Sequence, residues 1–426
     1  MSETQSTLPA RSHRVYPGWI MLGFSAAAQF MSAPGQSYSV SAFKSPMQEG
    51  LGVSETSLSL AYCVATIVSG MVLPWTGRQV DRFGARRILP VIAILLAGSC
   101  VVMANVSGLP GLYGGFALIR CLGQGAMWLV GTWIVGEWFL KKRGIATALS
   151  GIGASLSIML FPILNSRLID SFGWQNAWLA LGAIVAVTMI IPPALFLRNR
   201  PEDIGLLPDG ASPDQVTDAR PADSAVAPTT DTWTLQEVLR DATFWKLLSV
   251  GFCAGMIGTG LVFHQQTIFA AHGISKTMAM SLISFQAAVG TVATFGAGWL
   301  TDRLRAERLM AVAMLMLSGS AAIAWLMPHP SLAFVFAILG GLTGSILRTA
   351  GTIVWVNYYG RENQGVIRGA ALSAMILAAA LGPLPLAMAN DYWSSYGPAL
   401  ALFSVIPLLS MALVLTASQP QRAKPM

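Results

Sequence analysis

The sequence predicts an all-α polytopic membrane protein in which twelve transmembrane helices form two pseudo-symmetric six-helix bundles. Composition is the first observation behind this fold class. Of 426 residues, 54% are hydrophobic and only 11% are charged, and the mean hydropathy is +0.60. Soluble chains carry roughly 25% charged residues. A water-soluble fold could not hide this much apolar sequence, whereas lipid accepts the outward faces of a helical membrane protein.

A repeated loop is the second observation. The stretch Gly77–Arg87 is a short basic loop between two apolar runs, with the spacing G-x3-D-x2-G-x-R-R, and Gly298–Arg303 repeats it in reduced form. A second pair of similar loops follows the fourth and the tenth apolar runs, and these loops contain Gly144 and Gly365. The same separation of 221 residues relates Gly77 to Gly298, Asp81 to Asp302 and Gly144 to Gly365. One offset for two loops predicts two bundles of like construction.

Apolar runs give the individual helices. A spanning helix needs about 20 mostly apolar residues. The first run is too long for the core of a signal peptide, and it lacks a clean cleavage site, so we expect it to be a membrane helix. The twelve expected helices are 17–40, 57–76, 88–106, 112–135, 145–166, 175–197, 245–268, 278–300, 309–328, 332–355, 367–389 and 398–417.

The basic residues predict the orientation. With a cytoplasmic N-terminus, the inside segments hold 21 Lys and Arg, and the outside loops hold three, namely Lys44, Arg167 and Lys276. Cytoplasmic loops carry such an excess. We therefore expect a protein integral to the inner (plasma) membrane with both termini in the cytoplasm.

The longest polar stretch divides the chain in two. Residues 198–241 are rich in Pro, Asp, Ala and Thr, so most of this stretch is expected to be disordered. Within it, Trp233–Arg240 has helical apolar spacing and is expected to lie along the membrane interface. The predicted parts are an N-terminal tail (1–16), an N-terminal bundle (17–197), a linker (198–243), a C-terminal bundle (244–417) and a C-terminal tail (418–426).

Several function classes are excluded. The net charge of +7 does not indicate nucleic acid, because the basic residues lie in short gaps between apolar runs. No metal-ligand spacing, phosphate loop or catalytic set is present, so we expect no metal, no cofactor and no enzymatic activity. The cysteines fall inside apolar runs and are expected to pack as free thiols: Cys63, Cys100, Cys121 and Cys253.

The repeated loops resemble the loop between helices 2 and 3 of the major facilitator superfamily, and Arg120–Gly125 resembles its helix-4 motif. Three other segments, Tyr16–Trp19, Arg200–Gly210 and Phe244–Leu248, resemble the branch of monocarboxylate transporters and oxalate–formate antiporters. The resemblance implies a secondary active transporter with rocker-switch alternating access and a central cavity lined by helices 1, 4, 7 and 10. Members with monocarboxylate substrates often carry charged residues in helix 8. The expected helix 8 of this chain (278–300) has no charged residue inside it, only Gln286.

Polar side chains within these helices are the candidate substrate-binding residues. A charge at the bilayer centre costs on the order of 2.5–3.5 kcal/mol, so each needs a role. Arginine suits a carboxylate because its fork offers two parallel hydrogen bonds. Arg120 has a structural alternative, in which it satisfies backbone carbonyls, and His264 is either a proton carrier or a packing histidine. The candidates are Arg120, Gln124, Trp128, Arg348, Ser345, Gln29, Gln36, His264 and Gln286.

Every Asp and Glu is expected outside the helix centres, so no carboxylate in mid-membrane is offered for proton coupling. Three modes of coupling stay open. These are anion exchange, a proton carried by His264 or by the carboxylate of the substrate, and uniport.

The basic loops have a mechanical role in the resemblance. It implies that Asp81 lies against the N-terminus of helix 11, where the helix dipole favours a carboxylate, and that neighbouring arginines brace it. The alternative is a solvated loop that only sets topology. The predicted conformational latch consists of Gly77, Asp81, Arg82, Gly84, Arg86, Arg87, Asp302 and Arg303.

The expected substrate is a small organic anion of monocarboxylate type, with membrane lipid, and a coupling proton or counter-anion, as further partners. The alternatives are a neutral or drug-like metabolite as substrate and, in another class, a non-transporting membrane sensor.

Overall fold

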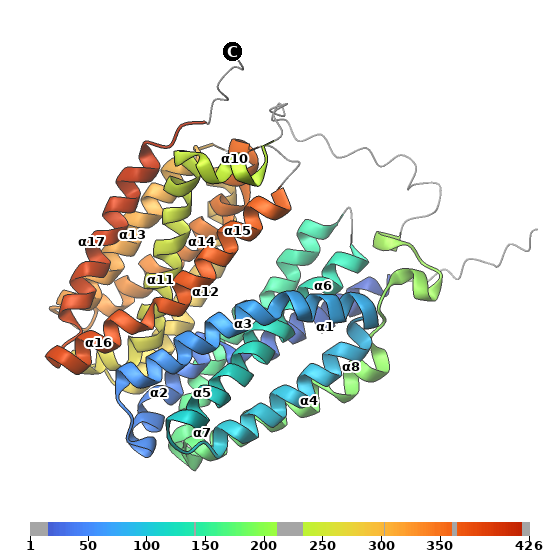
Figure 1. The fold of residues 1–426 in the computed structure, drawn as a ribbon, viewed down its shortest axis with the longest axis horizontal. Coiled ribbons are helices and arrows are strands. Elements are labelled where there is room, and N and C mark those ends of the chain that lie inside the picture. The colour runs from blue at the N-terminus through green and yellow to red at the C-terminus, as the bar shows by residue number, and fades with distance from the viewer. Residues whose placement is uncertain (1–15, 140–141, 211–232, 302, 360–363, 420–426) are drawn as a thin grey trace, which may run out of the picture.

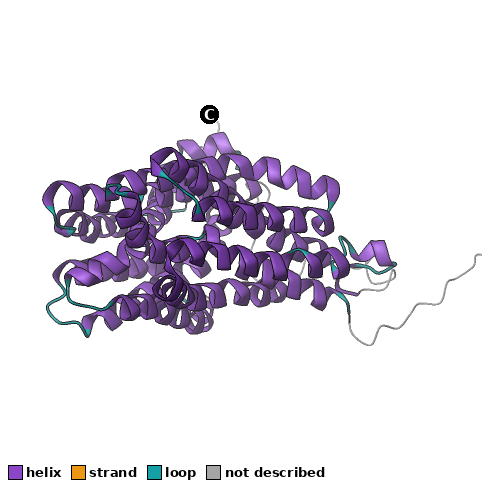
Figure 2. Ribbon diagram, turned by 90° about the horizontal axis from the view of Figure 1, so that it is seen from below, coloured by secondary structure: helices purple, strands orange, loops and turns teal. Residues whose placement is uncertain are grey.

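The computed structural model describes residues 16–139, 142–210, 233–301, 303–359 and 364–419. These residues form helices joined by short turns, and no strand occurs among them (Figure 2). Residues 211–232 of the linker that was expected to be disordered, and the latch residue Asp302, lie outside the described residues.

The N-terminal half contains six membrane-spanning segments, and the first and the fourth are irregular. Pro34 interrupts the first, since proline lacks the N–H that would continue the helix. A turn of π-helix lies in the middle of the fourth. The elements are α1 (Gly18–Met31), the 3-10 helix η1 (Ala33–Gly35), α2 (Ser37–Leu51), α3 (Glu55–Phe83), α4 (Ala85–Ala104), α5 (Gly108–Ile119), the π-helix η2 (Arg120–Met127), α6 (Trp128–Trp138), α7 (Arg143–Met189) and α8 (Ile191–Phe196).

The C-terminal half follows two 3-10 turns of the linker, η3 (Pro201–Ile204) and η4 (Pro208–Gly210). The expected interfacial helix is present as α10 (Leu235–Arg240), and Thr234 and Glu237 form its capping box. The membrane-spanning elements are α11 (Ala242–Ala271), α12 (Lys276–Thr301), α13 (Ala306–Leu326), α14 (Leu332–Tyr359), α15 (Gln364–Leu381), α16 (Pro383–Trp393) and α17 (Gly397–Leu415).

The predicted fold class is confirmed. Ten uninterrupted stretches among the described residues are long and apolar enough to cross a membrane. One of them, Ile145–Phe196, is two spans joined at Gly173, whose φ of 78° turns the chain back. The remaining span is the broken α1–α2 segment, which is apolar in α1 but polar in α2. The described chain thus crosses the membrane twelve times, six times in each half.

Figure 1 shows the two bundles side by side, with α10 at one end of the C-terminal bundle. We call the end that carries η3, η4 and α10 the linker end, and the opposite end the distal end. The bundles contact each other through α2 with α11, α3 with α15 and α16, and α7 with α12.

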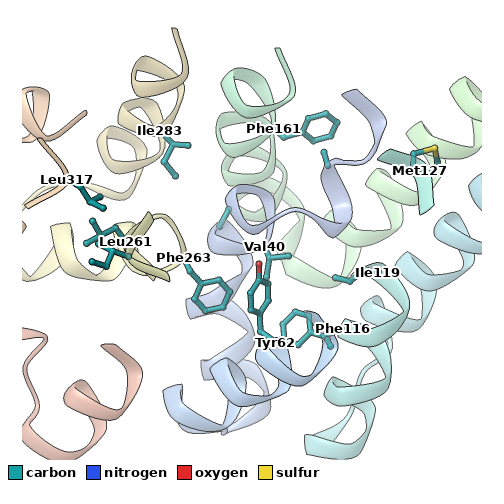
Figure 3. Close-up of a cluster of buried hydrophobic side chains, with 14 of the residues drawn as sticks. Val40, Tyr62, Phe116, Ile119, Met127, Phe161, Leu261, Phe263, Ile283 and Leu317 are labelled. Atoms are coloured by element: carbon teal, nitrogen blue, oxygen red, sulfur yellow. The ribbon is translucent and has the colours of Figure 1, made fainter. Parts of the chain in front are cut away.

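Aromatic side chains pack where the bundles meet. In Figure 3, Tyr62 lies between Phe116 of its own bundle and Phe263 of the other. The ring centroids are 6.0 Å apart for Tyr62 and Phe116 and 4.6 Å apart for Tyr62 and Phe263.

Candidate functional site

A cavity of about 780 Å³ runs along the C-terminal bundle. Its lining comes from α11 to α15, with Gln124 of η2 as the contribution of the N-terminal half. The walls are mainly apolar side chains and glycines of α11, and they reach Trp355 and Arg368 toward the linker end. Ligand sites have this character, in which an apolar enclosure holds a few polar groups.

Two arginines line this cavity, Arg348 and Arg368, and Arg368 has an interaction with another group. The Arg348 side chain on α14 is exposed and lines the wall. The Arg348 guanidinium forms no hydrogen bond or ion pair with any other described residue. A guanidinium free to use all its donors can hold a carboxylate through two parallel hydrogen bonds.

Two predicted glutamines face the same space. Gln124 and Gln286 both line the cavity, from opposite bundles. Among the described groups, the side-chain oxygen of each is buried and has no hydrogen-bond partner. Buried polar atoms are rarely left so. A ligand with a hydroxyl or amide could complete both.

A second cavity of about 320 Å³ lies on the side of the N-terminal bundle. It shares Gln124 and Ile376 with the first, so the two volumes are adjoining parts of one space. The predicted residues Gln36 and Trp128 line it, and Gln36 donates a 3.1 Å hydrogen bond to Ser32. Its other polar residues, Thr66 and Ser69 among them, are uncharged.

Gln29 and Ser345 lie outside the lining of both cavities. Gln29 is buried and donates its amide to Ser150 of α7. Ser345 is buried and contacts Thr294 of α12, with 3.3 Å between the hydroxyl oxygens. Both side chains therefore connect helices within one bundle. Their burial is explained by these contacts without any contact to a substrate.

Arg120 is fully engaged inside the N-terminal bundle. It donates to the carbonyl oxygen of Gly35 at 2.7 Å and to the Thr66 hydroxyl at 3.0 Å, and it lies 4.4 Å from the centroid of the Tyr62 ring. Only 1% of its side chain is exposed, and it lines neither cavity. This placement favours the structural alternative, because the break in the first span frees the Gly35 carbonyl that Arg120 satisfies.

His264 belongs to a polar cluster at the distal end rather than to the cavity. The polar cluster consists of Lys44 and Glu55 from the N-terminal bundle and of His264, Thr267, Asn390 and Tyr396 from the C-terminal bundle. Glu55 accepts from Lys44, from Asn390 at 2.7 Å and from Tyr396 at 2.7 Å. Lys44 and Glu55 are 1% and 3% exposed, so the pair is buried between the bundles.

The expectation for Lys44 was wrong here. Lys44 was expected in an outside loop, but it lies inside α2, which continues to Leu51 past the predicted end at residue 40. Glu55 is the first residue of α3, so it lies outside the helix centre as expected, but its burial between the bundles was not foreseen. Periodicity missed them because α2 is polar. The sequence did offer one indication, because Lys44 and Glu55 lie on either side of one short turn. That placement allows the lysine and the glutamate to form an ion pair.

Further contacts join the bundles near this cluster. Asp391 accepts from the backbone N–H of Thr56 at 2.8 Å. Lys276 donates to Asp170 at 2.9 Å. These contacts close the distal end, while the cavity reaches toward the linker end.

The stretch Gly77–Arg87 is not the loop that was expected, because α3 runs to Phe83 and α4 begins at Ala85, so only Gly84 lies between helices. The stretch is held within its own bundle. Asp81 accepts a 2.8 Å hydrogen bond from the indole of Trp133, and Arg86 contacts Asn199 and Ala194. Gly84, with φ of 77°, makes the turn between α3 and α4. Arg82 and Arg303 lie over the rings of Phe83 and Trp299. A Cβ on Gly77 would meet Leu129 of the same bundle at 3.9 Å, and Arg87 has no ion pair with another described residue.

The sequence matches the Major Facilitator Superfamily over residues 25–268 and 259–425. The chain belongs to this superfamily. This match confirms the predicted resemblance to the superfamily. The chain is therefore a transporter of the Major Facilitator Superfamily.

Two curated superfamily proteins align over most of the chain. The oxalate:formate antiporter of Oxalobacter formigenes is 23% identical over 362 residues, which cover 82% of this chain and 80% of that protein. The hexuronate transporter of Escherichia coli (strain K12) is 24% identical over 399 residues, 90% of each chain. The first supports the expected resemblance to the oxalate–formate branch.

Among solved structures, the superfamily fold recurs in a D-xylose-proton symporter. That structure is 16% identical, has a TM-score of 0.70, and covers 94% of this chain and 98% of its own. At this identity the likeness concerns the fold alone.

Proposed function

We propose that this superfamily member is a secondary active transporter that moves a small organic anion, of monocarboxylate type, by rocker-switch alternating access. The observation that carries the proposal is the guanidinium of Arg348, which lines the central cavity and has no bonded partner among the described residues. The side chain is exposed to the space of the cavity, so its donors are available to a ligand, and an anion there would form charge-assisted hydrogen bonds. A carboxylate would supply both the missing charge and a geometry that matches the fork.

The remaining lining sets the rest of the substrate. The N-terminal wall offers amides, hydroxyls and the indole of Trp128 but no charge. Arg348, without a partner among the described residues, faces these neutral polar groups, and this arrangement suits a single carboxylate with a hydroxyl or apolar body. The printed names of the two curated relatives, oxalate with formate and hexuronate, are those of organic anions, in keeping with this class.

The orientation follows from the basic residues. We infer that the linker end faces the cytoplasm and that the distal end faces outward across the plasma membrane, because the loops at the linker end carry most of the Lys and Arg. The chain then faces inward in this conformation, with its polar cluster closing the outer side. Opening outward would separate that cluster and close the linker end.

The latch belongs to the other half of this cycle. In this conformation Asp81 is bonded to Trp133 of its own bundle. On closing of the linker end, Asp81 would leave Trp133 and approach the N-terminus of α15, with Arg82, Arg86 and Arg303 beside it. The helix dipole would favour the carboxylate there.

A neutral or drug-like metabolite is the second candidate substrate, and the apolar glycine-rich wall of α11 favours it. Such a substrate would leave Arg348 without a charged partner. Coupling by anion exchange, by a proton, or not at all is compatible with the cavity itself.

The test is counterflow in proteoliposomes loaded with a set of monocarboxylates, dicarboxylates and neutral metabolites. We expect saturable monocarboxylate exchange by the wild type. Arg348→Gln should raise KM or lower uptake by about ten- to a hundredfold, since a hydrogen bond to a charged group contributes about 1.5–3 kcal/mol. Arg348→Lys should retain part of the activity through its charge.

The control is Arg167→Gln, which removes an exposed arginine of α7 that lines neither cavity. Its transport should equal that of the wild type. Undiminished carboxylate exchange by Arg348→Gln would refute the arginine site. Exchange of neutral metabolites alone would replace the anion with the second candidate.

A further inference from the structure

Two hydroxyl groups on the N-terminal side of the cavity are already committed as donors. Ser69 and Thr132 line the smaller of the two adjoining volumes. Ser69 donates to the carbonyl oxygen of Arg120 at 3.0 Å, and Thr132 donates to that of Leu129 at 2.8 Å. A hydroxyl has one hydrogen and two lone pairs, so only lone pairs are left for a ligand. Both groups therefore present hydrogen-bond acceptors to the cavity.

Thr132 is the more open of the two. Its side chain is exposed, whereas that of Ser69 is buried. The third hydroxyl of this side, Thr66, has no such capacity to spare, because it donates to the Tyr62 carbonyl oxygen at 2.8 Å and accepts from Arg120 at 3.0 Å. Among the three hydroxyl groups, Thr132 is thus the best placed to meet a ligand.

The C-terminal side offers the opposite polarity. Arg348 lines the larger volume, and a guanidinium has hydrogens to donate but no acceptor. The two volumes of about 780 and 320 Å³ adjoin at Gln124 and Ile376, so one ligand can reach both sides. Such a ligand needs a negatively charged acceptor for Arg348 and hydrogen-bond donors for the hydroxyl oxygens of the other bundle.

Hydroxyl groups are the donors that fit. A ligand hydroxyl can donate to Ser69 or Thr132 while both keep the bonds to their backbone carbonyls. An ammonium group would also donate, but among the described residues no Asp or Glu lines either volume to balance its charge. An alkyl chain has no donor, so it would desolvate these oxygens without giving them a partner, which costs affinity.

We propose that the substrate is a polyhydroxylated monocarboxylate of the sugar-acid type, whose carboxylate binds Arg348 and whose hydroxyl groups donate to Thr132 and Ser69. The inference rests on the proposed function, which leaves the body of the anion either hydroxylated or apolar. Thr132 and Ser69 then select the hydroxylated body, whereas Arg348 selects the charge that all carboxylates share. Affinity for the charge and affinity for the hydroxyl groups can therefore be separated by substitution.

Binding titrations by calorimetry, with the purified full chain in detergent, test this without any transport step. The hydroxylated probes are gluconate, galactonate, glucuronate and galacturonate, which cover several hydroxyl configurations. Hexanoate has as many carbons but no hydroxyl, leucine replaces the hydroxyls with an ammonium, and glucose has hydroxyls but no carboxylate.

We expect the best sugar acid to bind at least about tenfold more tightly than hexanoate or leucine, because a site that hydrogen-bonds a hydroxyl disfavours analogues that lack it. Glucose should also bind more weakly, because it leaves Arg348 without an anion.

Thr132→Val removes the acceptor and keeps the branched shape of the side chain. We expect it to raise the Kd of the best sugar acid by about two- to tenfold, the range of one neutral hydrogen bond, and to leave the Kd of hexanoate unchanged. The matched control is Thr188→Val. Thr188 of α7 donates to the carbonyl oxygen of Ile184 at 2.7 Å but lines neither volume, so this variant should bind both acids as the wild type does.

Hexanoate or leucine bound as tightly as the best sugar acid would overturn the hydroxylated substrate. A Thr132→Val variant that changes affinity for both acids equally, or for neither, would do the same. Arg348→Gln should weaken the sugar acids and hexanoate alike. If no carboxylate binds, or if glucose binds most tightly, the proposed anion transport itself fails.

Discussion

The guanidinium of Arg120 donates a 2.7 Å hydrogen bond to the carbonyl oxygen of Gly35, where the first membrane span is broken. The same side chain reaches Thr66 of α3 and the ring of Tyr62. Arg120 thus fixes a helix break to two neighbouring helices. Since Tyr62 also packs on Phe263 of the other bundle, the arginine positions the surface on which the bundles meet.

Arg120→Gln should therefore lower stability more than it lowers substrate affinity. The Gly35 carbonyl would lose its donor, and a buried unsatisfied group costs about 1–3 kcal/mol. Thermal unfolding in detergent measures the effect, with Arg348→Gln as the control, because Arg348 has no partner among the described residues. An unchanged melting temperature for Arg120→Gln, together with a large rise in KM, would return Arg120 to the substrate site.

Two glycines of α7 test how closely the first span packs. A Cβ on Gly153 would lie 2.0 Å from the backbone oxygen of Ala26, whereas one on Gly151 would meet nothing within 4 Å. Gly153→Ala should destabilise the protein by about 1–3 kcal/mol through overpacking. Gly151→Ala should be neutral or stabilising by up to about 1 kcal/mol. Equal melting temperatures for the two variants would contradict the close helix approach.

The contact between Asp170 and Lys276 offers a test of alternating access. Cysteines at both positions, joined by a short bis-thiol reagent, should hold the distal end closed and stop transport. Cleavage of the cross-link should restore it. The single-cysteine variants treated in the same way control for the native thiols. Normal transport by the cross-linked protein would show that the distal end need not open.

Asp81 tests the latch. Asp81→Asn should slow exchange by about two- to fivefold, since a carboxylate at a helix N-terminus contributes about 0.3–1 kcal/mol. Trp133→Phe removes the indole N–H that holds Asp81 in this conformation but leaves the carboxylate, so its rate should not fall in the same way. If Asp81→Asn exchanges at the wild-type rate, the loop serves topology alone.

The sequence determined the spans and their two-bundle arrangement. Apolar runs of the length of a bilayer must form helices, because lipid cannot satisfy free backbone groups. The offset shared by Gly77 with Gly298 and Asp81 with Asp302 showed the repeat. Gln124, Trp128, Arg348 and Gln286 were also found from helix position alone, since an isolated polar group in an apolar run has few places to face.

Only the tertiary structure decided what those polar groups touch. Arg120 and Arg348 look alike in the sequence, since each is an isolated arginine in an apolar run. In the structure Arg120 donates its hydrogen bonds to Gly35 and Thr66, whereas Arg348 faces the cavity. The polar cluster joins residues more than 200 positions apart, such as Glu55 and His264, and helical periodicity carries no information on such pairs. Burial of a charge is paid for by its partners, and partners that come from different helices exist only once those helices have packed.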